Sequence, residues 1–244
     1  MNIRNHIFNS WLINKPIAHR GLHGKNIPEN SLLAFEKAIS KGYSIEFDVQ
    51  SGKNGVPIVF HDRNLHRMTG KNIEISNLGK NELKKYKLKK SNERIHTLER
   101  VLEVINGRVP VIIEIKTNKK PGLFEQKIAN LLRNYKGDFA ISSFNPYTLA
   151  WFRIFYPDFI RGQNSSFFRK DKKLVSLYQD NLQKLKFNNI SKPHFIAYDI
   201  NEIPNKWLSK YSYLPIIGWT VKTQEQYSRA KLFVDNIIFE NIKP

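Results

Sequence analysis

The stretch Ile45-Glu46-Phe47-Asp48-Val49 decides how the rest of the sequence is interpreted. Its apolar and acidic residues alternate strictly, which is typical of a β-strand whose two faces meet different surroundings. Residues i and i+2 of a strand point to the same face, so the carboxylates of Glu46 and Asp48 are expected to lie side by side. The pattern therefore predicts a strand with two acidic groups on one face.

A second stretch, Val111-Ile112-Ile113-Glu114-Ile115-Lys116, repeats the alternation and places Glu114 and Lys116 on one face. If both strands belong to one parallel sheet, protein covers both faces, and buried carboxylates then need a paired cation or a metal ion. Three carboxylates and one lysine leave an excess of negative charge that a divalent cation would neutralise. For either strand alone, the solvent-facing side of an antiparallel sheet explains the alternation equally well.

Length and composition favour one globular unit. The chain has 244 residues, 41% of them hydrophobic, which suits a TIM-type barrel built as one domain. It has no cysteine, which excludes disulfides, thiolate metal sites and cysteine nucleophiles. The apolar patches before residue 16 are too short and interrupted for a signal-peptide core or a membrane span. We therefore expect a soluble, cytoplasmic protein whose single domain spans residues 1–244.

The formal net charge of +19 predicts attraction to an anionic partner, such as nucleic acid, an anionic membrane or a phosphorylated substrate. Basic residues are concentrated in two runs, 84–90 and 169–173. Lysine is frequent throughout, so these runs also fit ordinary solvated surfaces. No nucleic-acid-binding motif accompanies them, so we expect no specific nucleic-acid partner. The sequence predicts no particular oligomeric state.

The first third of the chain predicts a strand, a helix and a hairpin. A short buried strand at 16–19 precedes a loop, and Asn30 or Ser31 is expected to cap the following helix. The Asn54-Gly55 pair predicts a hairpin turn between the 45–49 strand and an arm at 57–61, which would bring His61 beside the acidic pair.

Residues 63–96 are polar and lysine-rich, with few apolar anchors. We interpret them as a small insertion after the second strand, with one short helix near 80–86. Thr97 is then expected to cap a helix that continues to Leu102.

The rest of the chain alternates between strand and helix. The expected strands are 111–116, 138–143, 159–163, 194–199, 215–221 and 235–239. The expected helices are 123–132, 146–155, 174–185, 204–210 and 224–231. With 16–19 and 44–49 this makes eight principal strands, which favours a (β/α)8 TIM-type barrel over a doubly wound open sheet.

Catalytic groups of such barrels lie at the carboxyl ends of the strands. Polar residues are expected at the ends of the first three strands and of the hairpin arm: His19, Arg20, Glu46, Asp48, His61, Glu114 and Lys116. Aromatic residues Phe144 and Trp219 fall at later strand ends, where they could line a substrate pocket or belong to the core.

These residue types suit phosphate chemistry. Glu46, Asp48 and Glu114 offer only carboxylate oxygens, which suit a hard cation, Mg²⁺ or Ca²⁺. Arg20 and Lys116 would hold a phosphate and stabilise its transition state. His19 and His61 fit a general acid and a general base. The residues thus point to metal-assisted cleavage of a phosphate ester.

Each of these residues also has a simpler interpretation. His19 alone would more often be a packing or capping residue, and His61-Asp62 could be a turn pair. Glu29 and Asn30 are more typical of a helix cap than of metal ligands. The remaining histidines in polar stretches are interpreted as surface residues: His23, His66 and His96.

The sequence resembles the glycerophosphodiester phosphodiesterase family. The motifs that carry the resemblance occur in the family's order: His19-Arg20-Gly21, Pro28-Glu29-Asn30-Ser31, Glu46-Phe47-Asp48-Val49, Pro57-Ile58-Val59-Phe60-His61-Asp62, Leu65-His66-Arg67-Met68-Thr69-Gly70, Thr97-Leu98-Glu99, Glu114-Ile115-Lys116, Ser142-Ser143-Phe144 and Gly218-Trp219-Thr220-Val221. Each motif is weak alone, whereas the ordered set from about residue 16 to the last strand is specific.

The resemblance implies a TIM-type barrel with a small insertion, and hydrolysis of glycerophosphodiesters to glycerol 3-phosphate and an alcohol. It implies one divalent ion at Glu46, Asp48 and Glu114, and an acid/base pair of His19 and His61. It also implies that Arg20 and Lys116 contact the phosphate.

The sequence departs from the family pattern at a few places. Ser31 stands where threonine is usual, and the last strand ends in Ile237-Ile238-Phe239-Glu240-Asn241, where the family tends to have a Thr-Asp-Pro-like ending. The insertion is short and basic, so a more open mouth is expected. Such a mouth could admit lysophospholipid-like substrates, and the basic surface could aid peripheral contact with an anionic membrane.

Two alternatives stay beside the phosphodiesterase hypothesis. A lysophospholipase D acting at a membrane surface would prefer lysolipid vesicles to soluble glycerophosphocholine. A non-catalytic barrel would bind anionic ligands in a salt-sensitive manner without turnover.

Overall fold

The computed structural model describes residues 10–167 and 176–244. It forms two compact units, one of residues 18–140 and one that combines the residues before 18 with those after 140. The unit boundaries fall inside the strands β1 and β6. The prediction of a single domain over residues 1–244 stays a prediction. The basic run at 169–173 lies outside the described residues.

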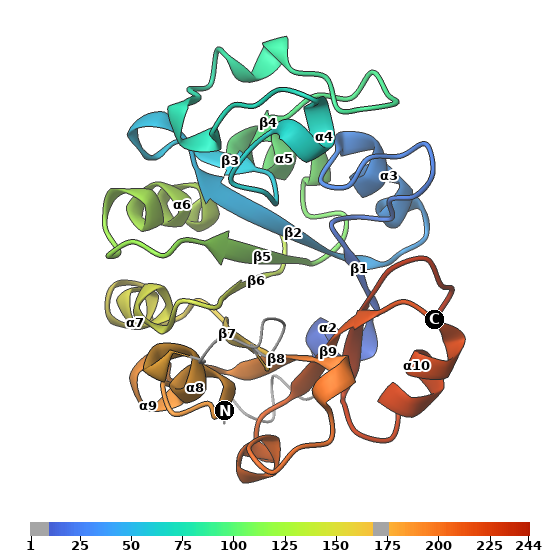
Figure 1. Cartoon of the computed structure of the whole chain (residues 1–244), viewed down its shortest axis with the longest axis vertical. Coiled ribbons are helices and arrows are strands. Elements are labelled where there is room, and N and C mark those ends of the chain that lie inside the picture. The colour runs from blue at the N-terminus through green and yellow to red at the C-terminus, as the bar shows by residue number, and fades with distance from the viewer. Residues whose placement is uncertain (1–9, 168–175) are drawn as a thin grey trace. The chain divides into compact units, whose positions relative to one another are not determined.

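The fold class predicted from the sequence is confirmed. Parallel strands alternate with helices along the chain (Figure 1), which is the architecture of a (β/α)8 barrel of the TIM type. Its eight strands are β1 (Ile17–His19), β2 (Ser44–Ser51), β5 (Val111–Lys116), β6 (Phe139–Ser143), β7 (Arg161–Ser165), β8 (Phe195–Asp199), β9 (Ile216–Val221) and β10 (Asn236–Phe239). Every strand expected from the sequence overlaps one of these.

The helices are short. They are α2 (Trp11–Asn14), α3 (Leu32–Ser40), α4 (His66–Thr69), α5 (Leu98–Ile105), α6 (Leu123–Arg133), α7 (Pro146–Phe155), α8 (Leu177–Gln183), α9 (Asn188–Ser191) and α10 (Gln224–Ala230). Five 3-10 helices join them in the described part of the chain: η1 (Lys53–Gly55), η2 (Ile75–Asn77), η3 (Leu83–Lys85), η4 (Ile200–Glu202) and η5 (Leu208–Tyr211).

The pairing of β2 with β5 places the acidic residues together. The two strands run parallel, with Asp48 opposite Glu114 and Gln50 opposite Lys116. Because paired residues of neighbouring strands point to the same face, Glu46, Asp48 and Glu114 share one face of this sheet. The opposite face carries Phe47 and Ile113, both fully buried.

The hairpin predicted after β2 is present, with an antiparallel pairing of β2 with β3 (Pro57–Val59). A two-residue strand, β4 (His96–Thr97), pairs with β3 in turn. The hairpin prolongs β2 to Ser51, so Glu46 and Asp48 lie inside the strand. The expectation that they lie at its end was wrong. His61 lies just beyond β3, which ends at Val59.

Two helix caps agree with the sequence and one predicted helix does not. Ser31 and Thr97 cap α3 and α5, each by accepting a hydrogen bond from the backbone N–H three residues later. The helix expected at 204–210 is wrong, since only the short η5 forms there. The side chain of Asn205 accepts from the N–H groups of Trp207 and Leu208, which favours a tight turn over a regular α-helix.

The insertion at 63–96 has a small core of its own, so the expectation of few apolar anchors was wrong. Its buried side chains pack against those of the hairpin in one cluster: Ile58, Phe60, Leu65, Ile75, Leu78, Leu83, Leu88 and Ile95. Apolar residues here are spaced irregularly because they belong to turns and 3-10 helices. A search for strand or helix periodicity therefore misses them.

The unit that contains residues 141–244 packs its strands closely. In the parallel pairing of β7 with β8, Gly162 lies opposite Phe195, whose ring occupies the space that a Cβ on Gly162 would take. At the amino end of this unit, the side-chain amide of Asn236 donates to the carbonyls of Leu12 and Lys15 and so ties α2 to β10.

Among the described residues, no helix is both long and apolar enough to cross a membrane. The cytoplasmic location stays a prediction.

Gly21, which follows the first strand, should be a steric requirement of the fold. Its φ is +78°, and a Cβ would lie 2.9 Å from backbone and side-chain atoms of Ala34. We expect Gly21→Ala to lower the free energy of unfolding by about 2 to 4 kcal/mol, from positive φ and overpacking together. Denaturant unfolding measures this.

Gly42 provides the matched control. Its φ is also positive, at +71°, but a Cβ there would have no heavy atom within 4 Å. Gly42→Ala should therefore lose only the conformational part, about 1 kcal/mol. Equal losses in the two variants would show that packing against Ala34 does not matter.

Candidate active site and metal centre

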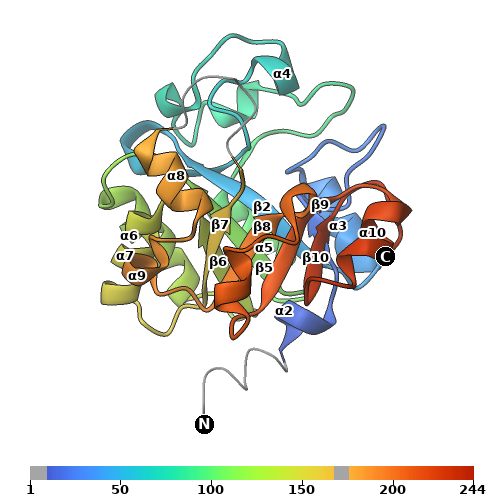
Figure 2. The ribbon, with the colours of Figure 1, turned by 60° about the horizontal axis from the view of Figure 1, so that its bottom comes forward.

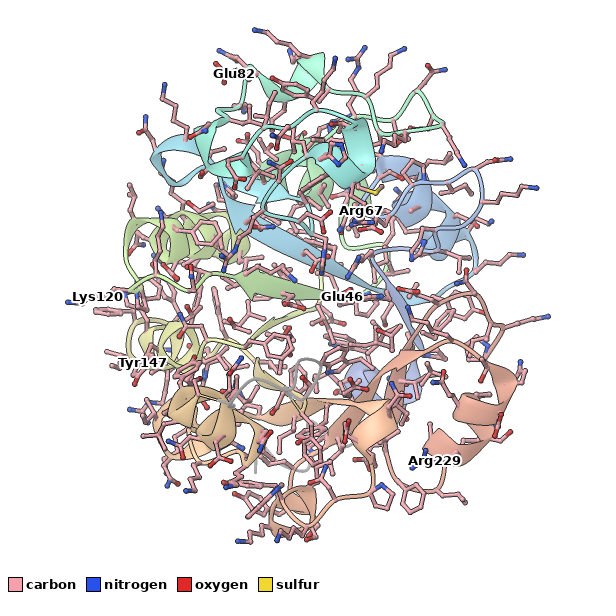
Figure 3. The ribbon with its side chains drawn as sticks, viewed as in Figure 1. Glu46, Arg67, Glu82, Lys120, Tyr147 and Arg229 are labelled. Carbon is pink, nitrogen blue, oxygen red and sulfur yellow. The ribbon has the colours of Figure 1, made fainter. Side chains whose placement is uncertain are left out.

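Three buried carboxylates lie together on the β2–β5 sheet. One oxygen from each of Glu46, Asp48 and Glu114 lies within 4.8 Å of the others. Glu46 and Asp48 are almost completely buried, and Glu114 is partly buried. Figure 3 shows Glu46 beside β2. The donor atoms are all carboxylate oxygens, as hard divalent cations prefer, so the residues fit a Mg²⁺ or Ca²⁺ site.

Asp48 is the most strongly supported member of the cluster. Asn30 donates from Nδ2 to Asp48 Oδ2 at 2.9 Å, and Arg20 Nε lies 3.2 Å from the same oxygen. Lys116 Nζ lies 3.3 Å from Asp48 Oδ1. Burial alone would raise the pKa of Asp48, but the charges of Lys116 and Arg20 outweigh it and hold the pKa well below its usual range. Asp48 is therefore ionised.

Glu46 and Glu114 are less well compensated. Burial raises the pKa of Glu46 well above its ordinary value, and the neighbouring charges of Asp48 and Glu114 raise it further. Burial also raises the pKa of Glu114, although Lys116 opposes this from 3.4 Å. Raised pKa values of buried neighbouring carboxylates show that the cluster carries more negative charge than its protein partners neutralise. A bound cation is the partner that this arrangement suits.

Two cationic side chains flank the carboxylates. Burial would lower the pKa values of Arg20 and Lys116, but the surrounding carboxylates raise them, so both groups are charged. Arg20 also donates from Nη1 to Glu29 Oε1 at 2.8 Å, and its backbone N–H donates to Glu46 Oε2 at 3.1 Å. Arg20 has a φ of 56°, so the chain turns sharply as it leaves β1 and brings this N–H to the cluster.

The two predicted acid/base residues border the same cluster. His19 Nε2 lies 3.8 Å from Glu46 Oε2. His61 Nδ1 lies 2.6 Å from Asp62 Oδ1, and because an ionised carboxylate only accepts hydrogen bonds, Nδ1 carries the proton. The backbone at His61 is held by Gln50, whose side-chain amide donates to the His61 carbonyl. All seven polar residues expected at the barrel mouth thus gather in one unit.

A network behind the histidine was missed by sequence reasoning. Arg67, on α4, donates to both oxygens of Asp62 and to both oxygens of Glu29 (Figure 3). Glu29 in turn accepts from Arg20. A continuous chain of ion pairs therefore links His61 to the carboxylate cluster. These hydrogen bonds hold the pKa values of Asp62 and Glu29 low, against the opposing effect of burial.

Two interpretations of flanking residues were wrong. Glu29 and Asn30 do not cap the first helix, because Ser31 does so and leaves them to bind Arg20 and Asp48. Of the histidines expected at the surface, only His66 is exposed, whereas His23 is partly buried and His96 lies in β4. Burial lowers the pKa of His96. The sequence held a signal for Arg67, since it belongs to the Leu65–Gly70 motif.

The two aromatic residues proposed to line a substrate pocket, Phe144 and Trp219, lie in the unit that contains residues 141–244. Phe144 and Trp219 pack edge to face, with ring centroids 5.7 Å apart. The backbone beside Phe144 is fixed by Gln163, whose amide donates to the carbonyl of Ser143 at 3.1 Å. The indole N–H of Trp219 is buried and has no hydrogen-bond acceptor among the described residues. A donor in this state is suited to meet a polar atom of a ligand.

Comparison with known proteins shows the family to which the chain belongs. The model of the glycerophosphoryl diester phosphodiesterase family matches residues 19–243. A glycerophosphodiester phosphodiesterase of Caldanaerobacter subterraneus is 37% identical over 145 residues, which cover 54% of this chain and 59% of that protein. The rat lysophospholipase D GDPD1 is 33% identical over 137 residues, 51% of this chain and 42% of that protein. The chain thus spans about half the length of these relatives.

A solved structure supports the fold over almost the whole chain. It is an Oleispira antarctica phosphodiesterase in complex with the product sn-glycerol-3-phosphate, with a TM-score of 0.74 at 24% identity. The match covers 94% of this chain and 93% of that one. At this identity the likeness establishes the fold alone. Because the family model matches residues 19–243, the chain belongs to the glycerophosphoryl diester phosphodiesterase family.

Proposed function

We propose that this protein hydrolyses glycerophosphodiesters to glycerol 3-phosphate and an alcohol. The observation that carries the proposal is the gathering of three buried carboxylates, two cations and two histidines in the unit of residues 18–140. Membership of the family supplies the substrate class. The names of relatives in several bacteria agree with it.

Glu46, Asp48 and Glu114 would hold one Mg²⁺ or Ca²⁺ ion. When bound, such an ion supplies positive charge that binds and polarises the oxygens of a phosphate diester. Asn30 supports this site, because its side-chain amide donates to the Asp48 carboxylate and accepts from the backbone N–H of Asp48, which fixes the carboxylate in one orientation. Positioned carboxylates reduce the reorganisation that cation binding requires.

Arg20 and Lys116 bind the phosphate in this proposal. Both are anchored by carboxylates at the base of the site, yet their side chains keep 15% and 24% exposure, so donors can reach a ligand. Arg20 stays charged at any physiological pH and presents several N–H groups that match phosphate oxygens. The negative charge that develops in the transition state is stabilised by these fixed donors.

His61 and His19 transfer protons in this proposal. With Nδ1 of His61 donating to Asp62, its Nε2 is available to accept a proton from the attacking hydroxyl or to protonate the leaving oxygen. The His61 side chain is 31% exposed, so substrate can reach it. His19 supplies the complementary step. Phe144 and Trp219 are proposed to contact the substrate.

A lysophospholipid is the second candidate substrate. The observation that favours it is the similarity to the rat enzyme named lysophospholipase D GDPD1, which covers about half of this chain. The bond cleaved would be the same type of phosphodiester. A rate with lysophosphatidylcholine above that with glycerophosphocholine would favour this candidate.

The activity test is release of glycerol 3-phosphate from glycerophosphocholine and glycerophosphoethanolamine, measured with Mg²⁺, with Ca²⁺ and with EDTA. We expect release with at least one ion and none in EDTA, because Arg20 and Lys116 compensate the charge of the carboxylate cluster only partly. Full release in EDTA would contradict the metal proposal. No release from any diester by folded protein would contradict the activity.

Glu46→Gln should separate stability from activity. Gln keeps the size of the side chain but removes a charge whose ionisation is opposed by burial and by two neighbouring carboxylates. In EDTA we expect the free energy of unfolding to rise by about 1 to 2 kcal/mol. With metal present, we expect the rate of turnover to fall by about a hundredfold or more.

Glu36→Gln is the control for this substitution. Glu36 is an exposed partner of Arg108. Neither stability in EDTA nor turnover should change appreciably in it. Lower stability of Glu46→Gln in EDTA would show that Glu46 is already neutralised by the protein itself.

Arg67→Ala should impair catalysis through His61. Removing the guanidinium frees Asp62, which orients the His61 ring. We expect kcat to fall by about 10- to 100-fold with little change in stability, as for other groups that orient catalytic ones. Steady-state kinetics and thermal unfolding give the two values.

Arg100→Ala is the matched control, because Arg100 forms an exposed ion pair with Glu103 on α5. Its kcat should stay within about twofold of the native value. A native kcat in Arg67→Ala would refute the positioning role.

A further inference from the structure

The outer face of α7 is unusually apolar for a helix that surrounds a barrel. Tyr147, Ile154 and Phe155 are 48%, 63% and 60% exposed. With Trp151 they follow the spacing i, i+4, i+7, i+8, so they form one stripe along the helix. In Figure 3 the side chain of Tyr147 lies at the outer side of α7.

The inner face of α7 is apolar as well. Leu149 and Phe152 are fully buried beneath the helix. Arg153 is the only charged residue between Pro146 and Phe155. A helix that only covers a sheet needs one apolar face and normally shows polar residues to water. The outer stripe of α7 is therefore not needed to cover the sheet, and it leaves Ile154 and Phe155 largely exposed.

The apolar surface continues onto α8 and α9. Leu177 and Tyr178 on α8 are 77% and 41% exposed, and Ile190 on α9 is 36% exposed. Phe187 joins the helices, because its ring packs against Tyr178 at 5.1 Å and against Tyr147 at 6.2 Å. The three helices lie side by side in both views (Figures 1 and 2).

We call this surface the α7–α9 surface and define it by its exposed or partly exposed apolar residues: Tyr147, Trp151, Ile154, Phe155, Leu177, Tyr178, Phe187 and Ile190. Contiguous apolar patches on a protein surface commonly mark interaction sites. Aromatic rings and aliphatic tips together resemble the residues that anchor proteins at the boundary of water and lipid.

Basic side chains accompany the surface. Arg153 is the basic residue of α7, and the exposed Lys186 and Lys192 flank α9. The acidic group of α8, Asp180, is already paired with Lys184 at 2.7 Å. The chain as a whole carries a net charge of +19. An anionic partner is therefore favoured.

We propose that the α7–α9 surface docks on an anionic membrane. A second copy of this chain would bring the same basic residues and a net charge of the same sign against the surface, which disfavours self-association. Nucleic acid would satisfy the charges but would leave Ile154, Phe155 and Leu177 without an apolar environment. A membrane with anionic headgroups provides both, since acyl chains receive the protruding side chains and headgroups pair with the lysines.

Sedimentation with vesicles tests the proposal independently of catalysis. The probe is vesicles of phosphatidylcholine with about 30 mol% phosphatidylglycerol, compared with phosphatidylcholine alone. We expect the native protein to bind the anionic vesicles, and Ile154→Ser combined with Phe155→Ser to weaken this binding by about tenfold or more. Both residues are largely exposed, so the variant should fold, which its melting temperature checks.

Leu232→Ser combined with Phe233→Ser is the matched control. These neighbours are 74% and 42% exposed and follow α10, outside the α7–α9 surface. Binding by this variant should stay within about twofold of native. Hydrolysis of soluble glycerophosphocholine should be unchanged in both variants, which separates docking from the proposed activity.

Trp151 provides a local readout, because it lies in the stripe and contacts the ring of Phe155 at 5.0 Å. Brominated acyl chains should quench the fluorescence of the vesicle-bound protein, and Trp151→Phe should remove most of this quenching. Three results would overturn the proposal: no binding to anionic vesicles, equal weakening by both double variants, or a dimer in sedimentation velocity that the Ile154/Phe155 variant dissociates.

Discussion

The structure of the site depends on one electrostatic constraint, the burial of three carboxylates on one face of β2 and β5. Parallel pairing in a closed barrel leaves Glu46, Asp48 and Glu114 little water, and the sheet register brings them within reach of one ion. Two cations compensate them only partly, because Arg20 is shared with Glu29. The raised pKa of Glu46 reflects burial and the negative charge that these two cations leave uncompensated, which a divalent cation would neutralise.

The flanking elements can be understood as supports for this cluster. The β2–β3 hairpin carries His61 back toward it, and the small apolar core of the insertion holds α4, from which Arg67 reaches Asp62 and Glu29. The basic insertion thus has a structural connection to the site besides its surface charge. Docking through the α7–α9 surface would hold the protein at a membrane, from which both proposed substrate classes, glycerophosphodiesters and lysolipids, derive.

The sequence predicted the parts of the structure that follow from periodicity. Alternation at 45–49 predicted that Glu46 and Asp48 share a face, and alternation at 111–116 predicted the same for Glu114 and Lys116, because side-chain direction in a strand depends only on position. The register of β2 with β5 then brings the two pairs to one face. The roles of Asn30 and Arg67 in supporting the site were not predicted. Asn30 reaches Asp48 from a turn, and Arg67 reaches Asp62 from the short helix α4; the positions of both depend on tertiary packing, and local rules offered Asn30 as a possible helix cap. The extension of β2 to Ser51 likewise follows from pairing with β3.

The central claim is that the carboxylate cluster binds a cation, and calorimetric titration of the metal-free protein with Mg²⁺ and Ca²⁺ tests it most directly. The account predicts about one bound ion per chain for the native protein, and loss of that binding in Asp48→Asn and in Glu114→Gln, each still folded. Absence of binding to the native chain, or unchanged binding in both variants, would contradict it.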